Sequence, residues 1–460
     1  MKKRIRIAQW VFLLTGLLGV TACQEDFLEV KPSSDIVQPT TPEDFQQLLD
    51  NANIFNYTAA LPQMAADEYF IYSREILDGL VTATQRNSYT WEKDLYGGEV
   101  KRGDWNTPYS AVFYANSVLD GLEQQKISSD NLRGWALFAR AYNMFNLASN
   151  FAVAYDEQTA ASDLGIPIRL HPEVDVLEQR ATLKESFGQI LTDLLEAAQL
   201  LDRDVPQANR NRPSKAAAFG MLARVYLYMR DYEAAERYAD SSLLIFNKLI
   251  DYNTVSQTSA TPFSYNTEEV LYVSRQIVDY SSTTSYSSTV DNHCAVDTVL
   301  MAMYEDDDLR RAIFFRENSQ GYYNVKRGYL GGGLYPFSGI ATDEIFLIKA
   351  ECAARRVDFE TALVYLNDLL SKRHRTGTFK SIQDQGNVLE LVINERRKEL
   401  VWRGLRWLDI KRLNKEGAGI RLSRDLDGDT FVLEPNSPNY VFPIPDDEVS
   451  MSGLIQNERE

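Results

Sequence analysis

The sequence predicts a mainly α-helical protein, in which a scaffold of tetratricopeptide-like helical hairpins carries an irregular, loop-rich region. Three observations lead to this fold class. Long stretches repeat apolar residues at three- to four-residue spacing, two segments share the small-residue pattern of a helical hairpin, and residues 251–345 lack both features. With 460 residues, 44% of them apolar and 25% charged, the chain can bury a large core.

Residues 1–22 have the layout of an export signal. Basic residues at positions 2, 3, 4 and 6 precede an apolar stretch from Trp10 to Val20, which is too short to span a membrane. The stretch ends in Val-Thr-Ala followed by Cys23, a sequence that resembles a bacterial lipobox. We therefore expect cleavage before Cys23 and a lipid on its sulfur. The alternative is a chance cysteine beside an ordinary cleavage site.

A proline-containing tether, residues 23–41, is expected to lead into a single domain formed by residues 42–460. Proline at the first helical position and threonine before it predict that a helix begins at Pro42 with Thr41 as its N-cap. Helical periodicity is then clearest over residues 106–125, 131–153 and 182–201. The last of these begins with a capping box of Thr182 and Glu185.

Two segments, residues 216–243 and 344–370, repeat one pattern. Each has alanines on both predicted helices and an Asp-aromatic-Glu sequence at the turn, Asp231 to Glu233 in the first and Asp358 to Glu360 in the second. Small residues let two antiparallel helices approach closely, and the aromatic ring fills the elbow. This favours tetratricopeptide-like hairpins, although a generic helical hairpin stays open because the Trp and Pro ends of the full motif are missing.

The loop-rich residues 251–345 contain many Ser, Thr, Tyr, Asn and Gly residues around a strand-like segment at 268–278. Long irregular stretches on a helical scaffold often carry function. Tyrosine rings suit the apolar face of a sugar, and amides suit its hydroxyl rim. The alternative is that the tyrosines only anchor the loops. The candidate ligand-binding residues are Trp91, Tyr96, Tyr280, Tyr286, Tyr322 and Tyr323.

Residues 392–417 carry charges and tryptophans on several faces of a predicted helix. On that helix Glu399 would reach Arg403 and Asp409 would reach Arg412, and we expect buried ion pairs here, not acid–base catalysis. Further on, residues 425–430 resemble the start of a calcium loop. Thr430 and Asn436 stand where an EF-hand needs Gly and Glu, so a hairpin turn through Asp427-Gly428 is predicted instead.

Composition excludes several classes of function. The formal charge of −17 argues against nucleic-acid binding and against electrostatic attraction to anionic lipids. Besides Cys23, only Cys294 and Cys352 are present, with three histidines, so neither a disulfide framework nor a metal site is expected. The acidic run from Glu305 to Asp308 could serve a glycoside hydrolase, but a helix cap explains it more simply. We therefore expect no catalytic residues and no cofactor.

Several motifs follow one another along the chain. Acidic "QED" follows Cys23, and "FLEVKP" comes next. The helix "WNTPYSAVFYANSVLDGL", the segments "ARAYNMFNLASNF" and "LGIPI", and the C-terminal "NERRKELVWRGLRWLDIKR" and "PIPDDEV" come after them. In this order the motifs resemble those of the SusD/RagB-like outer-membrane lipoproteins of the Bacteroidota, and "QED" is similar to the acidic surface-export signal of these bacteria. Arg403 departs from the pattern, because family members commonly have Glu at this position, directly before the glycine that is Gly404 here.

The resemblance implies a lipid-anchored binding protein on the outside of the outer membrane. Such proteins have four tetratricopeptide-like hairpins and no catalytic residues, and they sit as a lid on a TonB-dependent, SusC-like transporter. The expected ligand is an oligosaccharide, with oligopeptide capture as the alternative. A protein-interaction scaffold is a third class, which the transporter partner would partly satisfy. Ligand residues of the family lie in variable loops and are not carried over.

Overall fold

The structure is a computed structural model that describes residues 39–100, 103–173, 175–284, 293–384 and 386–460. The predicted signal segment, Cys23, nearly all of the tether, and Tyr286 lie outside the described residues. Thr41–Glu460 forms one compact unit. None of the described helices is long and apolar enough to cross a membrane.

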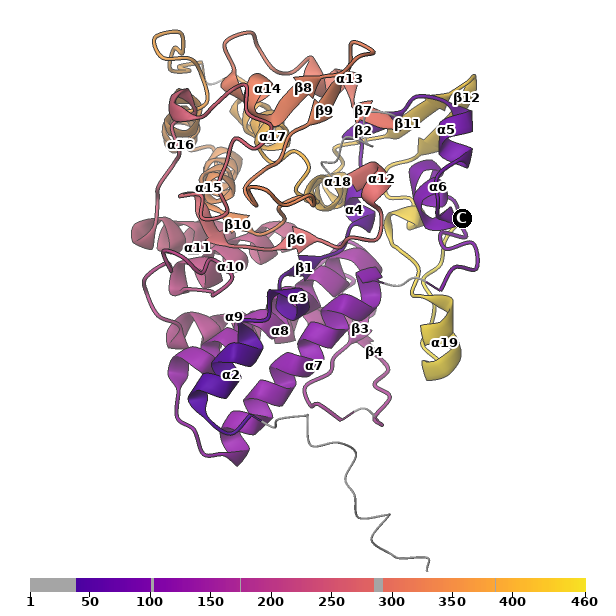
Figure 1. The fold of residues 1–460 in the computed structure, drawn as a ribbon, viewed down its shortest axis with the longest axis vertical. Coiled ribbons are helices and arrows are strands. Elements are labelled where there is room, and N and C mark those ends of the chain that lie inside the picture. Colours follow the sequence, from indigo (N-terminus) through magenta and orange to yellow (C-terminus); the bar gives the residue numbers. More distant parts are fainter. Residues whose placement is uncertain (1–38, 101–102, 174, 285–292, 385) are drawn as a thin grey trace, which may run out of the picture. The chain divides into compact units, whose positions relative to one another are not determined.

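The scaffold is an array of helices in which most neighbours along the chain pack side by side (Figure 1). Its members are α7 (Gly103–Gln124), α8 (Asp130–Phe151), α9 (Leu183–Leu200), α10 (Lys215–Met229), α11 (Tyr232–Ile245), α15 (Thr342–Arg355), α16 (Phe359–Ser371), α17 (Val388–Glu399) and α18 (Arg406–Lys415). α11 packs against α15, so the array continues across the long intervening segment. The predicted mainly α-helical, tetratricopeptide-like fold is confirmed.

Local sequence signals set the ends of these helices. The Asp231 side chain accepts a hydrogen bond from the backbone of α11, and Asp358 does the same for α16. Both predicted hairpin turns are therefore present, and the aspartate of each is the N-cap of the helix that follows. The predicted capping box of Thr182 and Glu185 is present at the start of α9. Thr41 likewise caps α2 (Pro42–Leu49), as predicted.

Short elements complete the unit, and the described strands pair only as two-stranded ribbons. The strands are β1 (Tyr57–Thr58), β2 (Tyr69–Ile71), β3 (Leu164–Pro167), β4 (Arg180–Thr182), β5 (Val270–Tyr272), β6 (Arg275–Gln276), β7 (Cys294–Val296), β8 (Phe315–Glu317), β9 (Tyr323–Val325), β10 (Ile340–Ala341), β11 (Leu422–Leu426) and β12 (Asp429–Leu433). The remaining α-helices are α3 (Ala52–Phe55), α4 (Leu61–Ala65), α5 (Arg74–Asp78), α6 (Ala83–Thr90), α12 (Ser281–Thr284), α13 (Thr298–Met301), α14 (Leu309–Phe314) and α19 (Asp446–Ser452).

Two predictions about strands are confirmed. The strand-like segment at 268–278 contains β5 and β6. Leu426 pairs with Asp429 across Asp427-Gly428, which have φ of 51° and 98°, so the expected hairpin turn joins β11 to β12.

The prediction of one helix through residues 392–417 is wrong. α17 ends at Glu399 and α18 begins at Arg406, because Trp402 and Gly404 turn the chain with φ of 64° and 72°. Glu399 therefore does not pair with Arg403, whose guanidinium instead binds the Asp343 carboxylate at 2.6 Å. The predicted pair of Asp409 and Arg412 is present at 2.8 Å, because both residues lie on α18.

Candidate ligand-binding surface

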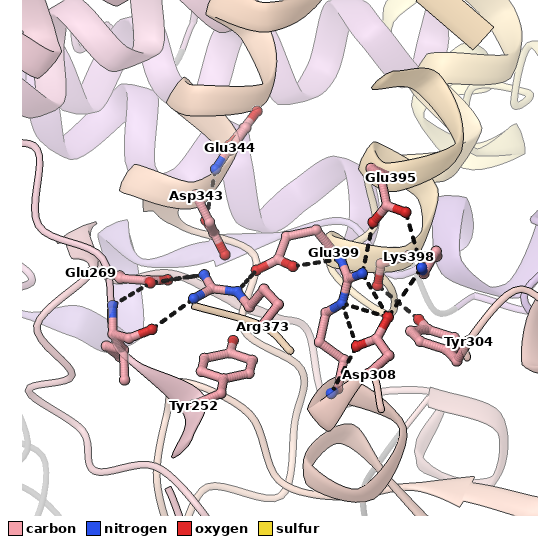
Figure 2. A network of polar contacts seen from close by, with 12 residues as sticks. Tyr252, Glu269, Tyr304, Asp308, Asp343, Glu344, Arg373, Glu395, Lys398 and Glu399 are labelled. Atoms are coloured by element: carbon pink, nitrogen blue, oxygen red, sulfur yellow. Dashed lines mark hydrogen bonds and ion pairs between the residues drawn. The ribbon is translucent and has the colours of Figure 1, made fainter. Parts of the chain in front are cut away.

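A buried ion network fastens the loop-rich region to the end of α17 (Figure 2). Glu399 accepts hydrogen bonds from Arg310 of α14 at 3.0 Å and from Arg373, which follows α16, at 2.8 Å. Arg373 also binds Glu269 at 2.8 Å, and all four side chains are fully buried. Four segments that lie far apart in the sequence thus meet at one charged centre.

Within this network carboxylates outnumber cations. The cations are Arg310, Arg373, Lys398 and Arg403, and the carboxylates are Glu269, Asp308, Asp343, Glu395 and Glu399. Burial, with a contribution from the nearby carboxylates of Asp343 and Glu399, raises the pKa of Glu269 to about 7. The network therefore has one more carboxylate than cations, and the Glu269 carboxylate is the one whose pKa lies near neutral pH.

Three aromatic side chains form a cluster that we call the aromatic platform: Phe70 of β2, Tyr72 just after it, and Tyr322 just before β9. The Tyr322 ring lies 5.0 Å from Phe70 and 5.8 Å from Tyr72, between ring centroids, and its side chain is 38% exposed. Phe70 is only partly buried, whereas its strand neighbours Tyr69 and Ile71 are in the core. Alternation along β2 therefore turns one aromatic ring outward.

An asparagine fixes the edge of the aromatic platform. The Asn318 amide donates to the Tyr72 hydroxyl at 2.8 Å, while its carbonyl oxygen accepts the backbone N–H of Tyr322 at 3.1 Å. Asn324 accepts a second hydrogen bond from the Asn318 amide and donates to the backbone of Cys294 in β7. The rings are therefore held in place by polar groups of the β8–β9 hairpin.

The two predicted tyrosines at the start of β9, Tyr322 and Tyr323, lie in different surroundings. Neighbouring strand residues point to opposite sides, and the Tyr323 hydroxyl accepts a hydrogen bond from Arg311 at 3.2 Å. Tyr323 lines a cavity of about 510 Å³ together with Arg311, Lys326 and Arg375. Tyr322 instead belongs to the aromatic platform.

The other described candidates are packed inside the protein. Trp91 is 4% exposed and its indole N–H donates to the backbone oxygen of Ala65. Tyr96 is 4% exposed and its hydroxyl donates to Pro443, while Tyr280 is 1% exposed. Their ring faces are covered by protein in this structure and are not open to a ligand.

Phe70, Tyr72 and Asn318 were not among the residues selected from the sequence. Phe70 and Tyr72 lie about 250 residues before Tyr322, outside the loop-rich segment. The alternation of "YFIY" at residues 69–72 was the available signal, but it does not reveal which distant segment lies alongside.

The acidic run from Glu305 to Asp308 has divided roles. Asp308 is the N-cap of α14 and is fully buried against Arg310, so the expected helix cap is present there, although it is not solvated. Asp306 is exposed and pairs with Arg311 at 3.2 Å.

A second cleft of about 490 Å³ lies elsewhere, between the end of α8, α18 and the C-terminal residues.

Comparison with known proteins identifies the family. A family model described as "Starch-binding associating with outer membrane" matches residues 26–227, and one described as "SusD family" matches residues 342–459. The chain belongs to the SusD/RagB-like family. Residues 228–341, which include Tyr322 and the β8–β9 hairpin, lie between the two matched segments.

Individual members of the SusD/RagB-like family are distant in sequence. SusD-like protein P38 of Formosa agariphila is 23% identical over 258 residues, which are 54% of this chain and 47% of P38, so the match spans about half of that relative. A putative sugar-binding protein from Bacteroides vulgatus is 20% identical with a TM-score of 0.73, covering 92% of this chain and 99% of the other. A laminarin-binding SusD-like protein is 17% identical with a TM-score of 0.62, covering 90% and 97%. The structural likenesses show the fold.

Proposed function

We propose that this protein captures an oligosaccharide at the cell surface and delivers it to a TonB-dependent, SusC-like outer-membrane transporter, without catalysing a reaction. The aromatic platform carries this proposal. Ring faces can take the apolar C–H side of a pyranose, and the tyrosine hydroxyls at the edge can take its hydroxyls. The proposed ligand residues are Phe70, Tyr72 and Tyr322, which Asn318 holds in position, with Tyr323 on the neighbouring cavity and the predicted Tyr286.

Two further observations support a glycan ligand. One matched family model is described as starch-binding, and one protein with the same fold binds laminarin. Glu269, Glu395 and Glu399 of the network all engage buried cations, so these three carboxylates do not offer the free pair that a glycoside hydrolase uses.

Isothermal calorimetry of the purified protein against a panel of glycans, including laminarin oligosaccharides, tests the proposal. Tyr322→Ala should weaken binding of the recognised glycan at least tenfold, because it removes one stacking face. Tyr265→Ala is the matched control, since Tyr265 is a 41% exposed tyrosine outside the platform and should leave affinity unchanged.

The outcomes separate the alternatives. If Tyr322→Ala and Phe70→Ala both leave glycan affinity unchanged, the platform is not the binding site. If oligopeptides bind and no glycan does, the ligand class is the alternative one. Release of reducing ends from a bound glycan would contradict the proposal that the protein only binds.

Lipid anchoring through Cys23 is a separate part of the proposal. Cys23→Ala should release the protein from the outer membrane of cells that lack the transporter, because the variant has no sulfur to which the lipid can be attached. Continued membrane retention of this variant in such cells would contradict anchoring at this residue.

A further inference from the structure

Next to the buried network, three side chains from two segments converge at the surface. Glu305 and Asp307 precede α14, and His374 follows α16, and each offers a ligand atom within 4.8 Å of the others. His374 is 5% exposed, and its Nδ1 is buried without a hydrogen-bond partner. This nitrogen faces the cluster, with the Asp307 Oδ1 oxygen 3.5 Å away. A buried polar atom left without a partner is costly, so a missing partner is indicated.

The backbone holds the two segments in register. Asp308 and His374 form an antiparallel bridge, the Arg375 N–H donates to the Asp307 oxygen at 3.0 Å, and the Leu309 N–H donates to the Arg373 oxygen at 2.9 Å. Asp308 and Arg373, which neighbour two of the converging side chains, are themselves fixed in the network (Figure 2). The positions of Asp307 and His374 are therefore set before any ligand binds.

The charges of this cluster are not neutralised by the protein. Within the described part of the chain, neither Glu305 nor Asp307 forms an ion pair with a lysine or arginine, although Asp306 pairs with Arg311 and Asp308 with Arg310. The other group of acids with suitable spacing, Glu269, Asp343 and Glu399, differs in this respect. Arginine guanidinium groups already bind its members, which leaves no room for an ion.

Distances and donor types favour one class of ligand. The 3.5 Å between His374 Nδ1 and Asp307 Oδ1 is longer than the donor–acceptor distance of a good N–H···O hydrogen bond. Two ligand atoms that each lie about 2.1 Å from a tetrahedral ion are about 3.4 Å apart, which is close to this separation. One imidazole with two carboxylates is a donor set that suits zinc and related divalent transition metals. Glu305 is exposed, so the fourth coordination position of the ion would be accessible to water.

We propose that Glu305, Asp307 and His374 bind a divalent transition-metal ion of the zinc class. The ion clasps the turn before α14 to the segment after α16, beside the cavity that Tyr323 lines. This proposal does not depend on glycan binding, because the site is argued from its own donors and backbone.

Calorimetry and thermal unfolding of the tag-free, chelator-treated full chain test the proposal, with zinc chloride as the probe and calcium chloride as the comparison. One equivalent of zinc should bind and raise the unfolding temperature, because ligand that binds only the folded state stabilises it. Asp307→Asn and His374→Ala should each weaken zinc binding at least tenfold. Asp306→Asn, a neighbouring carboxylate whose side chain is fully exposed, should change it less than twofold.

The opposite results would overturn the proposal. Absence of zinc binding, or zinc binding that both variants retain, would exclude a site at these residues. Calcium binding tighter than zinc would exclude the proposed class of ion. If His374→Ala does not fold, Glu305→Gln replaces it, since Glu305 is exposed and its loss should weaken zinc binding without unfolding the protein.

Discussion

The fully buried Glu399 carboxylate lets us predict how stability depends on the ion network. Glu399→Gln keeps the shape of the side chain but removes its charge, so Arg310 and Arg373 each lose one of their carboxylate partners. Removing one member of a buried, hydrogen-bonded ion network typically costs about 3–5 kcal/mol. We expect the low end, about 3 kcal/mol, because Arg310 keeps Asp308 and Glu395 and Arg373 keeps Glu269.

The cost should also depend on pH. In the wild type the pKa of Glu269 is raised to about 7, so its carboxyl binds a proton more tightly in the folded than in the unfolded protein. Its contribution to stability is therefore full at low pH and is lost as pH rises through about 7. Glu399→Gln removes one of the charges that raise this pKa. The variant should lose less stability than the wild type on going from pH 6 to pH 8, by up to about 1 kcal/mol.

Urea unfolding followed by circular dichroism at pH 6 and pH 8 measures both effects. The control is Glu196→Gln, which removes one carboxylate from the exposed pair with Arg133 and should change stability by less than about 1 kcal/mol at either pH. A cost for Glu399→Gln no larger than that of Glu196→Gln would refute the role of the network. A cost that grows from pH 6 to pH 8 would refute the assignment of the excess charge to Glu269.

Two further predictions concern other buried positions. Burial raises the pKa of Glu68 to about 7, so the wild type should gain unfolding free energy when the pH falls from 8 to 6. Glu68→Gln should reduce this gain by about 1 kcal/mol. A gain that is the same in the variant would contradict the raised pKa. A Cβ at Gly339 would lie 2.0 Å from the backbone oxygen of Tyr272, so Gly339→Ala should cost about 2–3 kcal/mol, measured by urea unfolding. Gly188→Ala on α9, where a Cβ would meet no other side chain or neighbouring segment within 4 Å, should instead gain up to about 1 kcal/mol. Equal effects of the two changes would refute the close approach at Gly339.

Features that depend on residues a few positions apart could be predicted from the sequence. The capping box at Thr182, the turns at Asp231 and Asp358 and the Asp427-Gly428 hairpin were all predicted, because each places its hydrogen bond or its positive φ within a few residues. The same locality explains why the helical periodicity located the scaffold helices.

Features that depend on distant segments could not be predicted. Periodicity favoured one helix through residues 392–417, and only the structure shows that Trp402 adopts a positive φ there. Its backbone N–H lies 3.2 Å from the buried carboxylate of Glu68, more than 300 residues away, which helps to hold the turn. Composition likewise favoured Trp91 as a ligand contact, since it cannot tell a core indole from an exposed one.

The candidate site likewise combines a residue that local sequence could indicate with residues that come from a distant segment. Tyr322 was selected because of its polar surroundings, but the partner rings of Phe70 and Tyr72 come from β2. β2 reaches the hairpin because it pairs with β7, which packs on β9. That arrangement joins segments more than 200 residues apart, and no local pattern specifies it.

The buried network explains how a loop-rich region can still present a fixed surface. Loops usually lose conformational freedom when they bind, and that loss weakens affinity. Here Asp308 and Arg310, which begin α14, are bound by Glu395, Lys398 and Glu399 of α17, and β8 follows α14 directly. The hairpin that carries Tyr322 is therefore ordered by folding and not by the ligand. A platform whose rings and asparagine are already in place can gain binding free energy from a sugar without ordering its own backbone.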